Sequence, residues 1–514
     1  MRRKKGINKT ILQAVILAAA LSLSGCATAA VTTGAGPVVN AEGGAEQSST
    51  EHTEEDISEE GVDFYENHED GEHAILADGE TKEYSNAKVV KTGEADGDEA
   101  DFYGENAAVF ATNGGTLTLS DMDIETDGTH ANAVFSYGEG TTVNISDSVI
   151  KTSGNCSGGL MTTGGGTMNA EDLDIHTTGN SSAAIRSDRG GGTVNVEGGT
   201  YITDGTGSPV IYSTADITVT DASLTSNASQ GVVVEGKNSV ALNDTDLTAL
   251  NNTKNSDKSD YYQAVMIYQS MSGDADEGLA SFTMKGGTLD NKNGDIFFVN
   301  NTRAEIDLED ADITNEDESG VFLRAAAAGW GNEGENGGNV DMKADSQTID
   351  GDMLVDDIST LNLYLSNGSE FNGAINPDGE AGDVYVELSG GSQWTLTGDS
   401  YITSLTCEID SIDLNGHKLY VNGNLYSEGT VSSGEAIKVE IKSSGSGAPG
   451  KPGDGNPPDG KMGEKPEGAP DGNPPDGKMG EKPEGAPDGN PPEGGGPGGN
   501  PPDKNRDENS GSES

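Results

Sequence analysis

Four residues in the middle of the chain have side chains of the kinds that form sugar-binding surfaces. They are Arg186, Tyr212, Glu235 and Tyr268, and each directly follows an apolar residue of a recurring pattern. If the apolar residues point into a core, these four side chains point outward and form one exposed column. Aromatic rings stack on the faces of sugar rings, and charged groups make directed hydrogen bonds. The column is therefore our first candidate for a ligand-binding site.

The segment RSDRGGG adds Asp188 and Arg189 at a chain corner beside this column. A polysaccharide lyase needs a basic group that abstracts a sugar proton, with acidic groups or calcium to neutralise the uronate, and Arg186 and Asp188 have those chemistries. Such enzymes normally cluster several carboxylates on neighbouring strands, whereas this column carries only Glu235. We therefore expect a binding protein and no enzymatic activity. A plainer alternative is an ordinary polar surface on which Arg186 stacks on Tyr212.

An aspartate recurs once per repeat at the same place in the pattern. The positions are Asp121, Asp147, Asp172, Asp221, Asp244 and Asp310, and Gly198 and Gly286 take this place in two further repeats. Carboxylates stacked roughly 5 Å apart repel one another unless they are hydrogen-bonded or bridged by a cation, so calcium at Asp121, Asp147 and Asp172 is one interpretation. We favour turns in which each aspartate bonds to its own backbone, because calcium takes roughly six to eight oxygens and one carboxylate per repeat supplies few. No cofactor is therefore expected, and calcium is the sole candidate.

The start of the chain combines a basic stretch, an apolar stretch at residues 11–23 and a small-residue site. The sequence Leu23-Ser24-Gly25-Cys26 resembles the lipobox of bacterial lipoproteins, which implies that the Cys26 thiol receives a diacylglyceryl group and becomes the mature N-terminus. We therefore expect an exported protein that is held on a membrane by lipidated Cys26 and exposed at the cell surface. The alternative is an ordinary secretory signal with a chance cysteine.

The elements that would position the candidate residues belong to a repeat of about 25 residues. The sequence GGTLTLSDMDIETDG at 114–128 returns as GTTVNISDSVIKTSG at 140–154 and as GGTMNAEDLDIHTTG at 165–179. A further apolar pair, such as Val134-Phe135, lies between successive copies. Three short strands per repeat are the simplest interpretation, and neither a leucine-rich signature nor a helical half-repeat is present. The pattern thus predicts an all-β fold, a right-handed parallel β-helix in which equivalent strands pair at roughly 4.8 Å.

The apolar residues within each copy keep a fixed spacing. In the first copy Leu117 and Leu119 alternate with polar residues, and Ile124 follows five positions later. The same spacing recurs in later copies, and the exception is the copy in which Val196 and Ile202 stand six positions apart. Alternation of this kind predicts strands with one face buried in the core.

The composition agrees with a narrow core. Glycine supplies 75 of 514 residues, while hydrophobic residues make up 32% and aromatic residues 5%, which suits a β-helix lumen better than a thick globular core. The net charge of −59 at pH 7 argues against nucleic acid or an acidic membrane surface as a partner. Cys156 and Cys407 lie many turns apart, so we expect no disulfide between them.

Composition divides the chain into four parts. We predict a lipoprotein signal peptide at 1–26, an acidic disordered spacer at 27–73, the parallel β-helix at 74–440 and a disordered tail at 441–514. The tail is rich in proline and glycine, and the sequence GNPPDGKMGEKPEGAPD occurs in it twice. Such a repeat cannot pack a core and favours extended, mobile conformations.

The repeats resemble the right-handed β-helix passengers of bacterial surface adhesins and autotransporters. The resemblance is strongest in a W-x-L…S-x-I-x-x-L pattern carried by Trp394, Leu396, Ser400, Ile402 and Leu405. Residues 180–219 are also similar to a segment of β-helix lipoproteins from gut anaerobes. The translocator domain of autotransporters has no counterpart in the sequence, so we expect export by the general pathway. The resemblance implies a fold and a surface location, but no reaction.

These observations favour an adhesin-like binding protein that contacts glycans, or a host or envelope surface ligand, through an exposed strand face. One alternative is a polysaccharide lyase or glycoside hydrolase on the same scaffold. Another is a structural stalk that binds nothing. The sequence leaves the ligand open.

Overall fold

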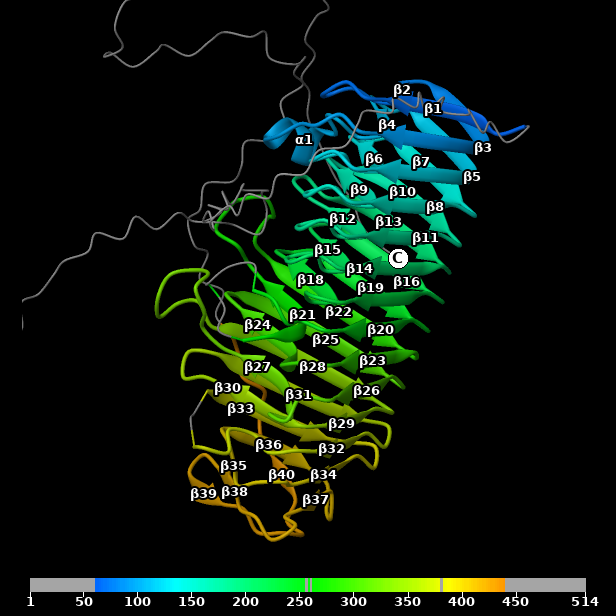
Figure 1. Ribbon diagram of the computed structural model, residues 1–514. Coiled ribbons are helices and arrows are strands. Elements are labelled where there is room, and N and C mark those ends of the chain that lie inside the picture. The colour runs from blue at the N-terminus through cyan, green and yellow to red at the C-terminus, as the bar shows by residue number, and fades with distance from the viewer. Residues whose placement is uncertain (1–60, 255–257, 259–260, 380–381, 440–514) are drawn as a thin grey trace, which may run out of the picture. The chain divides into compact units, whose positions relative to one another are not determined.

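The computed structural model describes residues 61–254, 258, 261–379 and 382–439. These residues form a parallel β-helix, as the repeats predict: the chain winds through successive turns, and equivalent strands of neighbouring turns pair side by side (Figure 1). Sheets of 22 and 11 strands make up most of it, and sheets of four and three strands complete the last turns. The described residues contain one helix, α1 (Asp98–Tyr103), and no helix long and apolar enough to cross a membrane.

The 22-stranded sheet contains the second and third strands of most turns. Its members are β1 (Asp63–Asn67), β3 (Thr81–Lys91), β5 (Thr116–Thr126), β7 (Thr142–Ser146), β8 (Val149–Thr152), β10 (Gly166–Glu171), β11 (Asp174–Thr177), β13 (Gly192–Glu197), β14 (Thr200–Thr203), β16 (Asp216–Thr220), β17 (Ser223–Ser226), β19 (Ser239–Asn243), β20 (Asp246–Ala249), β22 (Leu279–Lys285), β23 (Thr288–Asn291), β25 (Thr302–Glu309), β26 (Asp312–Asn315), β28 (Gly338–Asp345), β31 (Thr360–Ser366), β33 (Asp383–Leu388), β36 (Ser404–Cys407) and β40 (Ser432–Ser433).

The 11-stranded sheet contains the first strands of the turns. Its members are β2 (Ile75–Asp78), β4 (Val109–Thr112), β6 (Val134–Tyr137), β9 (Leu160–Thr163), β12 (Ile185–Ser187), β15 (Ile211–Ser213), β18 (Val232–Glu235), β21 (Gln263–Tyr268), β24 (Asp295–Asn300), β27 (Val321–Ala325) and β30 (Asp352–Val355). The four-stranded sheet holds β29 (Thr348–Asp350), β32 (Glu370–Asn372), β34 (Gln393–Thr395) and β37 (Ile412–Asp413). The three-stranded sheet holds β35 (Ser400–Ile402), β38 (Leu419–Val421) and β39 (Asn424–Leu425).

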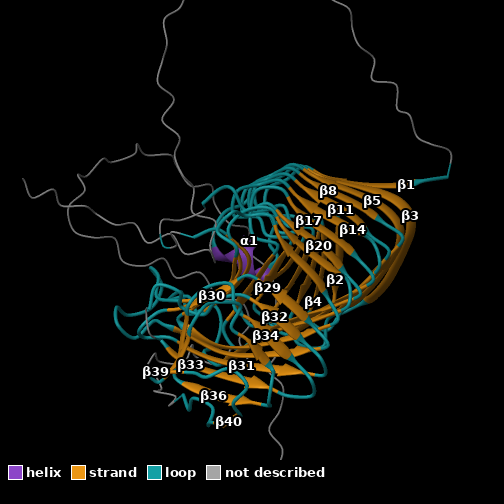
Figure 2. Cartoon of the chain, turned by 90° about the horizontal axis from the view of Figure 1, so that it is seen from below, coloured by secondary structure: helices purple, strands orange, loops and turns teal. Residues whose placement is uncertain are grey.

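One turn illustrates the arrangement. Its strands β12, β13 and β14 pair in parallel with β9, β10 and β11 of the turn before and with β15, β16 and β17 of the turn after. Seen from below, equivalent strands of successive turns lie side by side, and loops gather at the corners (Figure 2). Side chains at equivalent positions therefore form columns along the stack, with neighbours roughly 4.8 Å apart.

The apolar residues of the two-then-five pattern face the lumen and form one continuous core. Leu117 and Val143, for example, are register partners and fully buried. The predicted exception is wrong, because Tyr201, and not Ile202, is the inward residue of β14. Tyr201 lies five positions after Val196, so the spacing of the pattern holds. The Tyr201 ring packs in the lumen core as the aliphatic residues of the other turns do, although it carries a polar hydroxyl.

The β-helix begins earlier than the sequence predicts. β1 lies within the segment predicted to be a disordered spacer, yet it pairs in parallel with β3. Tyr65 packs edge-on against Tyr84 with ring centroids 5.3 Å apart, and the buried Lys91 ammonium donates to the Glu69 carbonyl at 2.6 Å. These tertiary contacts order an acidic stretch whose own pattern predicts disorder. Residues 27–60 of the predicted spacer, the signal peptide and the tail from 441 onward lie outside the described residues.

Candidate functional site

An open groove of about 640 Å³ crosses five neighbouring strands of the 22-stranded sheet, namely β5, β7, β10, β13 and β16. Its central column consists of Thr118, Asn144, Asn169, Asn195 and Thr218, which are successive register partners. Because the strands are parallel and in register, these side chains repeat at the strand spacing of roughly 4.8 Å. The groove therefore offers a regular row of polar groups along the stack.

The three asparagines of this column are hydrogen-bonded in series. The Nδ2 of Asn195 donates to the Oδ1 of Asn169 at 2.9 Å, and the Nδ2 of Asn169 donates to the Oδ1 of Asn144 at 2.9 Å. An amide nitrogen carries two hydrogens, and each ladder bond uses one of them. The ladder thus fixes the orientation of the amides while a further N–H on each rung can reach a ligand.

A second column lies two residues further along the same strands. It consists of Ser120, Ser146, Glu171, Glu197 and Thr220. Glu171 and Glu197 are register partners, both are exposed, and they are the only charged side chains among the described residues that line the groove. A line of amide donors therefore runs beside a line of hydroxyl and carboxylate acceptors.

The repeat pattern itself places the asparagines outward. Asn144, for instance, stands between the inward residues Val143 and Ile145. Asparagine then recurs at the same place in the next two copies, as Asn169 and Asn195. This recurrence is a usable signal in the sequence, but the predicted site rested on charged and aromatic side chains of the first strands and did not include the asparagines.

The residues predicted as a ligand-binding column occupy two columns and not one. Arg186 is the register partner of Tyr212, and Glu235 is the partner of Tyr268. The partner of Tyr212 on β18, however, is Val233, two positions before Glu235. The prediction slipped here because β18 begins with successive valines, which give no cue to which side chain faces the lumen.

The same four side chains are buried, so the prediction of an exposed contact face is wrong. Their exposed fractions are 5% for Arg186, 4% for Tyr212 and 0% for Glu235 and Tyr268. They point away from the lumen, as expected, but segments outside the strands cover them. The repeats reveal the strands and carry no information about which insertions pack on the outer face.

The covering segments form a second apolar cluster outside the lumen. Tyr212, Met266, Tyr268 and Phe298 from the first strands pack there with Trp330 from the loop after β27. The Tyr268 and Trp330 rings meet edge to face with centroids 5.2 Å apart. This face of the 11-stranded sheet therefore belongs to the interior of the protein.

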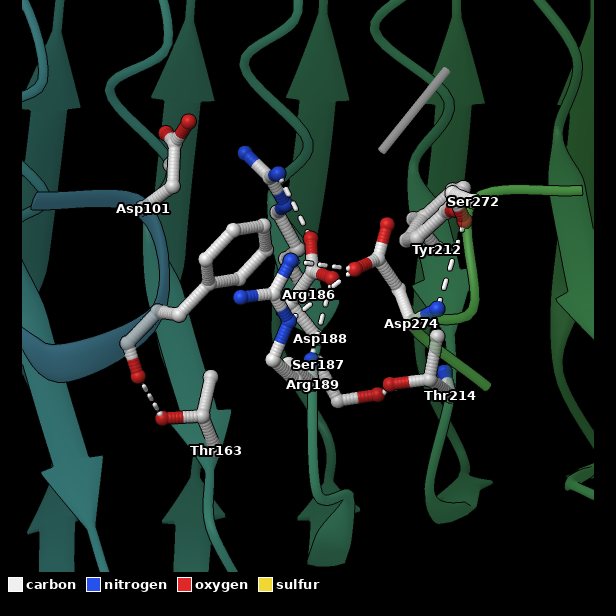
Figure 3. A network of polar contacts seen from close by, with 12 residues as sticks. Asp101, Thr163, Arg186, Ser187, Asp188, Arg189, Tyr212, Thr214, Ser272 and Asp274 are labelled. Atoms are coloured by element: carbon white, nitrogen blue, oxygen red, sulfur yellow. Dashed lines mark hydrogen bonds and ion pairs between the residues drawn. The ribbon is translucent and has the colours of Figure 1, made fainter. Parts of the chain in front are cut away.

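A polar network ties α1 and the loop at residues 269–278 onto this face (Figure 3). The Arg189 guanidinium lies 3.3 Å from Asp98 in α1 and 2.7 Å from Asp274 in the loop, and it stacks 3.9 Å from the centroid of the Phe102 ring. The Thr163 hydroxyl donates to the Phe102 carbonyl at 2.6 Å. Arg189, a predicted ligand-binding residue, is thus engaged in holding two insertions.

Asp188 sits beneath these insertions, fully buried. It accepts from the Arg186 Nη2 at 2.7 Å and from the Arg189 backbone N–H at 3.0 Å. Burial raises the pKa of the Asp188 carboxyl to about 7, although the neighbouring Arg186 guanidinium works against the rise. The carboxyl therefore exchanges its proton near neutral pH.

Glu235 is the second buried carboxyl of this region. The hydroxyls of Tyr212 and Tyr268 both donate to its Oε2, the latter at 3.0 Å. Burial raises the pKa of Glu235, and these two donors oppose the rise. The cavity beside Arg186 and Tyr212 measures about 10 Å³, about the size of one water, so the predicted residues have no room for a sugar.

The aspartates of the corner column lie in the left-handed region of backbone conformation. The φ angles are 52° at Asp121, 48° at Asp147 and 50° at Asp172, and Gly198 takes the same corner with φ of 69°. Glycine, aspartate and asparagine tolerate this region best, so the backbone accounts for the recurring residue type. Within the described ranges, no group of three or more His, Cys, Asp or Glu side chains is arranged to hold a metal ion.

The fold and the groove together define a parallel β-helix protein with a polar groove along one sheet. Comparisons of the chain with protein-family models, curated proteins and solved structures found no match. Cys407 is buried and forms no disulfide, whereas Cys26, the predicted lipidation site, lies outside the described residues.

Proposed function

We propose that the protein is a surface-anchored binding protein that holds an extended polymer, most simply a glycan, in the groove across β5, β7, β10, β13 and β16. The observation that carries this proposal is the asparagine ladder, which sets polar groups in register on successive turns. A β-helix holds such groups in place before binding, so little ordering entropy opposes the contact. The proposed site therefore lies on the second strands of the turns, whereas the sequence predicted a site on the first strands. Both are outward faces of strands.

The anchoring part of the proposal rests on Leu23-Ser24-Gly25-Cys26 and its resemblance to a lipobox. Acyl chains on Cys26 would hold the protein on a membrane, since each buried CH₂ contributes about 0.8 kcal/mol. Cys26→Ala should therefore move the protein from the membrane fraction to the soluble fraction of cells that express it. If the variant stays in the membrane fraction to the same extent as the wild type, this part of the proposal is wrong.

A glycan array probed with the full-length chain tests the binding part. Asn169→Ala removes the middle of the ladder and should lower the signal of any glycan bound in the groove. Asn227→Ala is the matched control, because Asn227 is exposed, makes one side-chain hydrogen bond to Asp204 and lies outside the groove lining. Release of cleaved product would favour a polysaccharide-degrading enzyme, and the absence of any bound glycan would favour a structural stalk.

A further inference from the structure

The charge and spacing of the groove select among polymers, and this inference rests on the proposed function. We infer that the groove binds an unbranched, β-linked glycan without acidic groups, with one sugar unit per strand. Three features of the groove carry this inference: its charge, its repeat distance and the position of its ends.

The first feature is charge. Glu171 and Glu197 stand on adjacent strands, and no lysine, arginine or histidine occurs among the described residues that line the groove. A chain of uronic acids would bring a carboxylate close to these glutamates on each strand without a cation to pair with it, and juxtaposed like charges disfavour binding. Neutral hydroxyls can instead donate to the glutamates and accept from the asparagine amides.

The second feature is the repeat distance along the stack. The central column repeats at the strand spacing of roughly 4.8 Å. A β-1,4-linked hexose chain is straight, and each of its sugars advances by a distance close to this spacing. An α-1,4-linked chain curls, so it would leave a straight row of groups after a few sugars. A straight chain can therefore set one sugar against each of Asn144, Asn169 and Asn195 in turn. Because successive β-1,4-linked sugars are turned over, the amides meet hydroxyls of opposite ring edges at alternate strands.

The third feature is the position of the ends. After Thr218 the central column continues through Ala241, which has no polar side chain. Further along it reaches Asp307 and Lys343, whose ion pair of 3.3 Å occupies the column with charged groups. At the other end Thr118 adjoins the charged Glu83 of β3. The row of uncharged polar side chains thus spans the five strands that line the groove, enough for a chain of about five sugars.

Isothermal titration calorimetry of the full-length chain with three soluble pentamers tests the inference. Cellopentaose is neutral and β-linked, a pentamer of β-1,4-mannuronate is acidic with the same linkage, and maltopentaose is neutral and α-linked. We expect cellopentaose to bind more tightly than either of the others by about 10-fold or more, since each lost or repelled contact changes affinity by about that factor. Affinity should also rise from cellobiose to cellopentaose and then level off.

Two sets of variants test whether the glycan binds in the groove and whether the charges of Glu171 and Glu197 exclude acidic glycans. Asn169→Ala and, separately, Asn195→Ala should weaken cellopentaose about 5- to 10-fold, while Asn227→Ala leaves it unchanged. The double variant Glu171→Gln with Glu197→Gln keeps one acceptor oxygen on each side chain and removes the charge, so it should gain affinity for the mannuronate pentamer. Circular dichroism of each variant checks that the β-helix is intact, and having two separate asparagine variants guards against a failure of one to fold.

The outcomes separate the inference from the function on which it rests. If mannuronate or maltopentaose binds as tightly as cellopentaose and Asn169→Ala or Asn195→Ala weakens it, the groove is a glycan site but the inferred class is wrong. If the asparagine variants weaken the binding of none of the pentamers and of no glycan on the array, the proposed function is wrong, and the inference that rests on it is wrong too.

Discussion

The Nη2 of Arg189 lies 2.7 Å from the Oδ1 of Asp274, although 85 residues separate the two in sequence. Through its other terminal nitrogen the same guanidinium approaches Asp98 at 3.3 Å. One side chain on the corner after β12 therefore joins α1, which precedes β4, to the loop between β21 and β22. Insertions from distant turns are held together over the first strands, which explains why the predicted contact face is buried.

Removal of this side chain should loosen both insertions and leave the stacked strands in place. We expect Arg189→Ala to speed amide hydrogen exchange at residues 98–103 and 269–278, with strands β12, β15 and β18 still protected, because these insertions depend on tertiary contacts outside the strand ladder. Hydrogen exchange read by mass spectrometry measures this segment by segment.

The matched control is Lys237→Ala. Lys237 lies 2.6 Å from Asp276 of the same loop, but both side chains are more than half exposed, at 56% and 55%. Exposed ion pairs contribute little to stability. Exchange that is equally slow in the Arg189→Ala variant and the wild type would mean that other contacts, such as the hydrogen bond from Thr163 to the Phe102 carbonyl, hold the insertions without Arg189.

Protonation of Asp188 should make stability depend on pH in a definite direction. Its carboxyl has a pKa of about 7 in the folded protein, above the ordinary value of 3.8, so the folded state binds this proton more tightly than the unfolded state. The contribution to stability is complete at low pH and is lost as the pH rises through about 7. The charged neighbours that act on it are Arg186, Asp274 and Glu235.

Asp188→Asn removes this titration while it keeps the shape of the protonated carboxyl. The melting temperature of the variant relative to that of the wild type should therefore rise as the pH goes from about 5 to about 8. Thermal unfolding followed by circular dichroism at several pH values measures the difference. A difference that stays constant, or falls, across this range would show that Asp188 titrates elsewhere.

The lumen could be predicted from sequence because each strand alternates and each copy repeats the alternation. Leu117, Leu119 and Ile124 and their equivalents needed no tertiary information. The outer face differs, since Arg186 and Tyr212 have the same local pattern whether a loop covers them or not. Burial there depends on α1, on residues 269–278 and on the loop that carries Trp330, which belong to no repeat. The asparagine ladder lay within reach of the sequence, but its significance appears only once Asn144, Asn169 and Asn195 are known to be register partners.

Two buried tyrosines offer a paired test of how polar groups are satisfied. The Tyr201 hydroxyl faces the lumen and has no hydrogen-bond partner in the described part of the chain, whereas the Tyr212 hydroxyl donates to Glu235. An unpartnered buried hydroxyl costs about 1 to 3 kcal/mol, and a hydrogen bond to a charged group contributes about 1.5 to 3 kcal/mol.

Tyr201→Phe should therefore raise the free energy of unfolding by about 1 kcal/mol, and Tyr212→Phe should lower it by about 2 kcal/mol. Equilibrium unfolding in urea measures both, and the two variants delete the same atom, so their volume effects match. Destabilisation by Tyr201→Phe would mean that a buried water bonds to the hydroxyl.

The corner aspartates give the last prediction, which separates backbone conformation from calcium binding. Asp147 has φ of 48°, a region that glycine adopts freely and alanine enters at a cost of about 1 kcal/mol. Asp147→Gly should thus change the free energy of unfolding by less than about 1 kcal/mol, whereas Asp147→Ala should lower it by about that amount and Asp147→Val by more. Thermal unfolding of these variants is measured with added calcium and with a chelator. If calcium bridged Asp121, Asp147 and Asp172, it would raise the melting temperature of the wild type, and Asp147→Gly would abolish the rise. We expect no such calcium effect, because the left-handed corner alone accounts for the residue type at each turn.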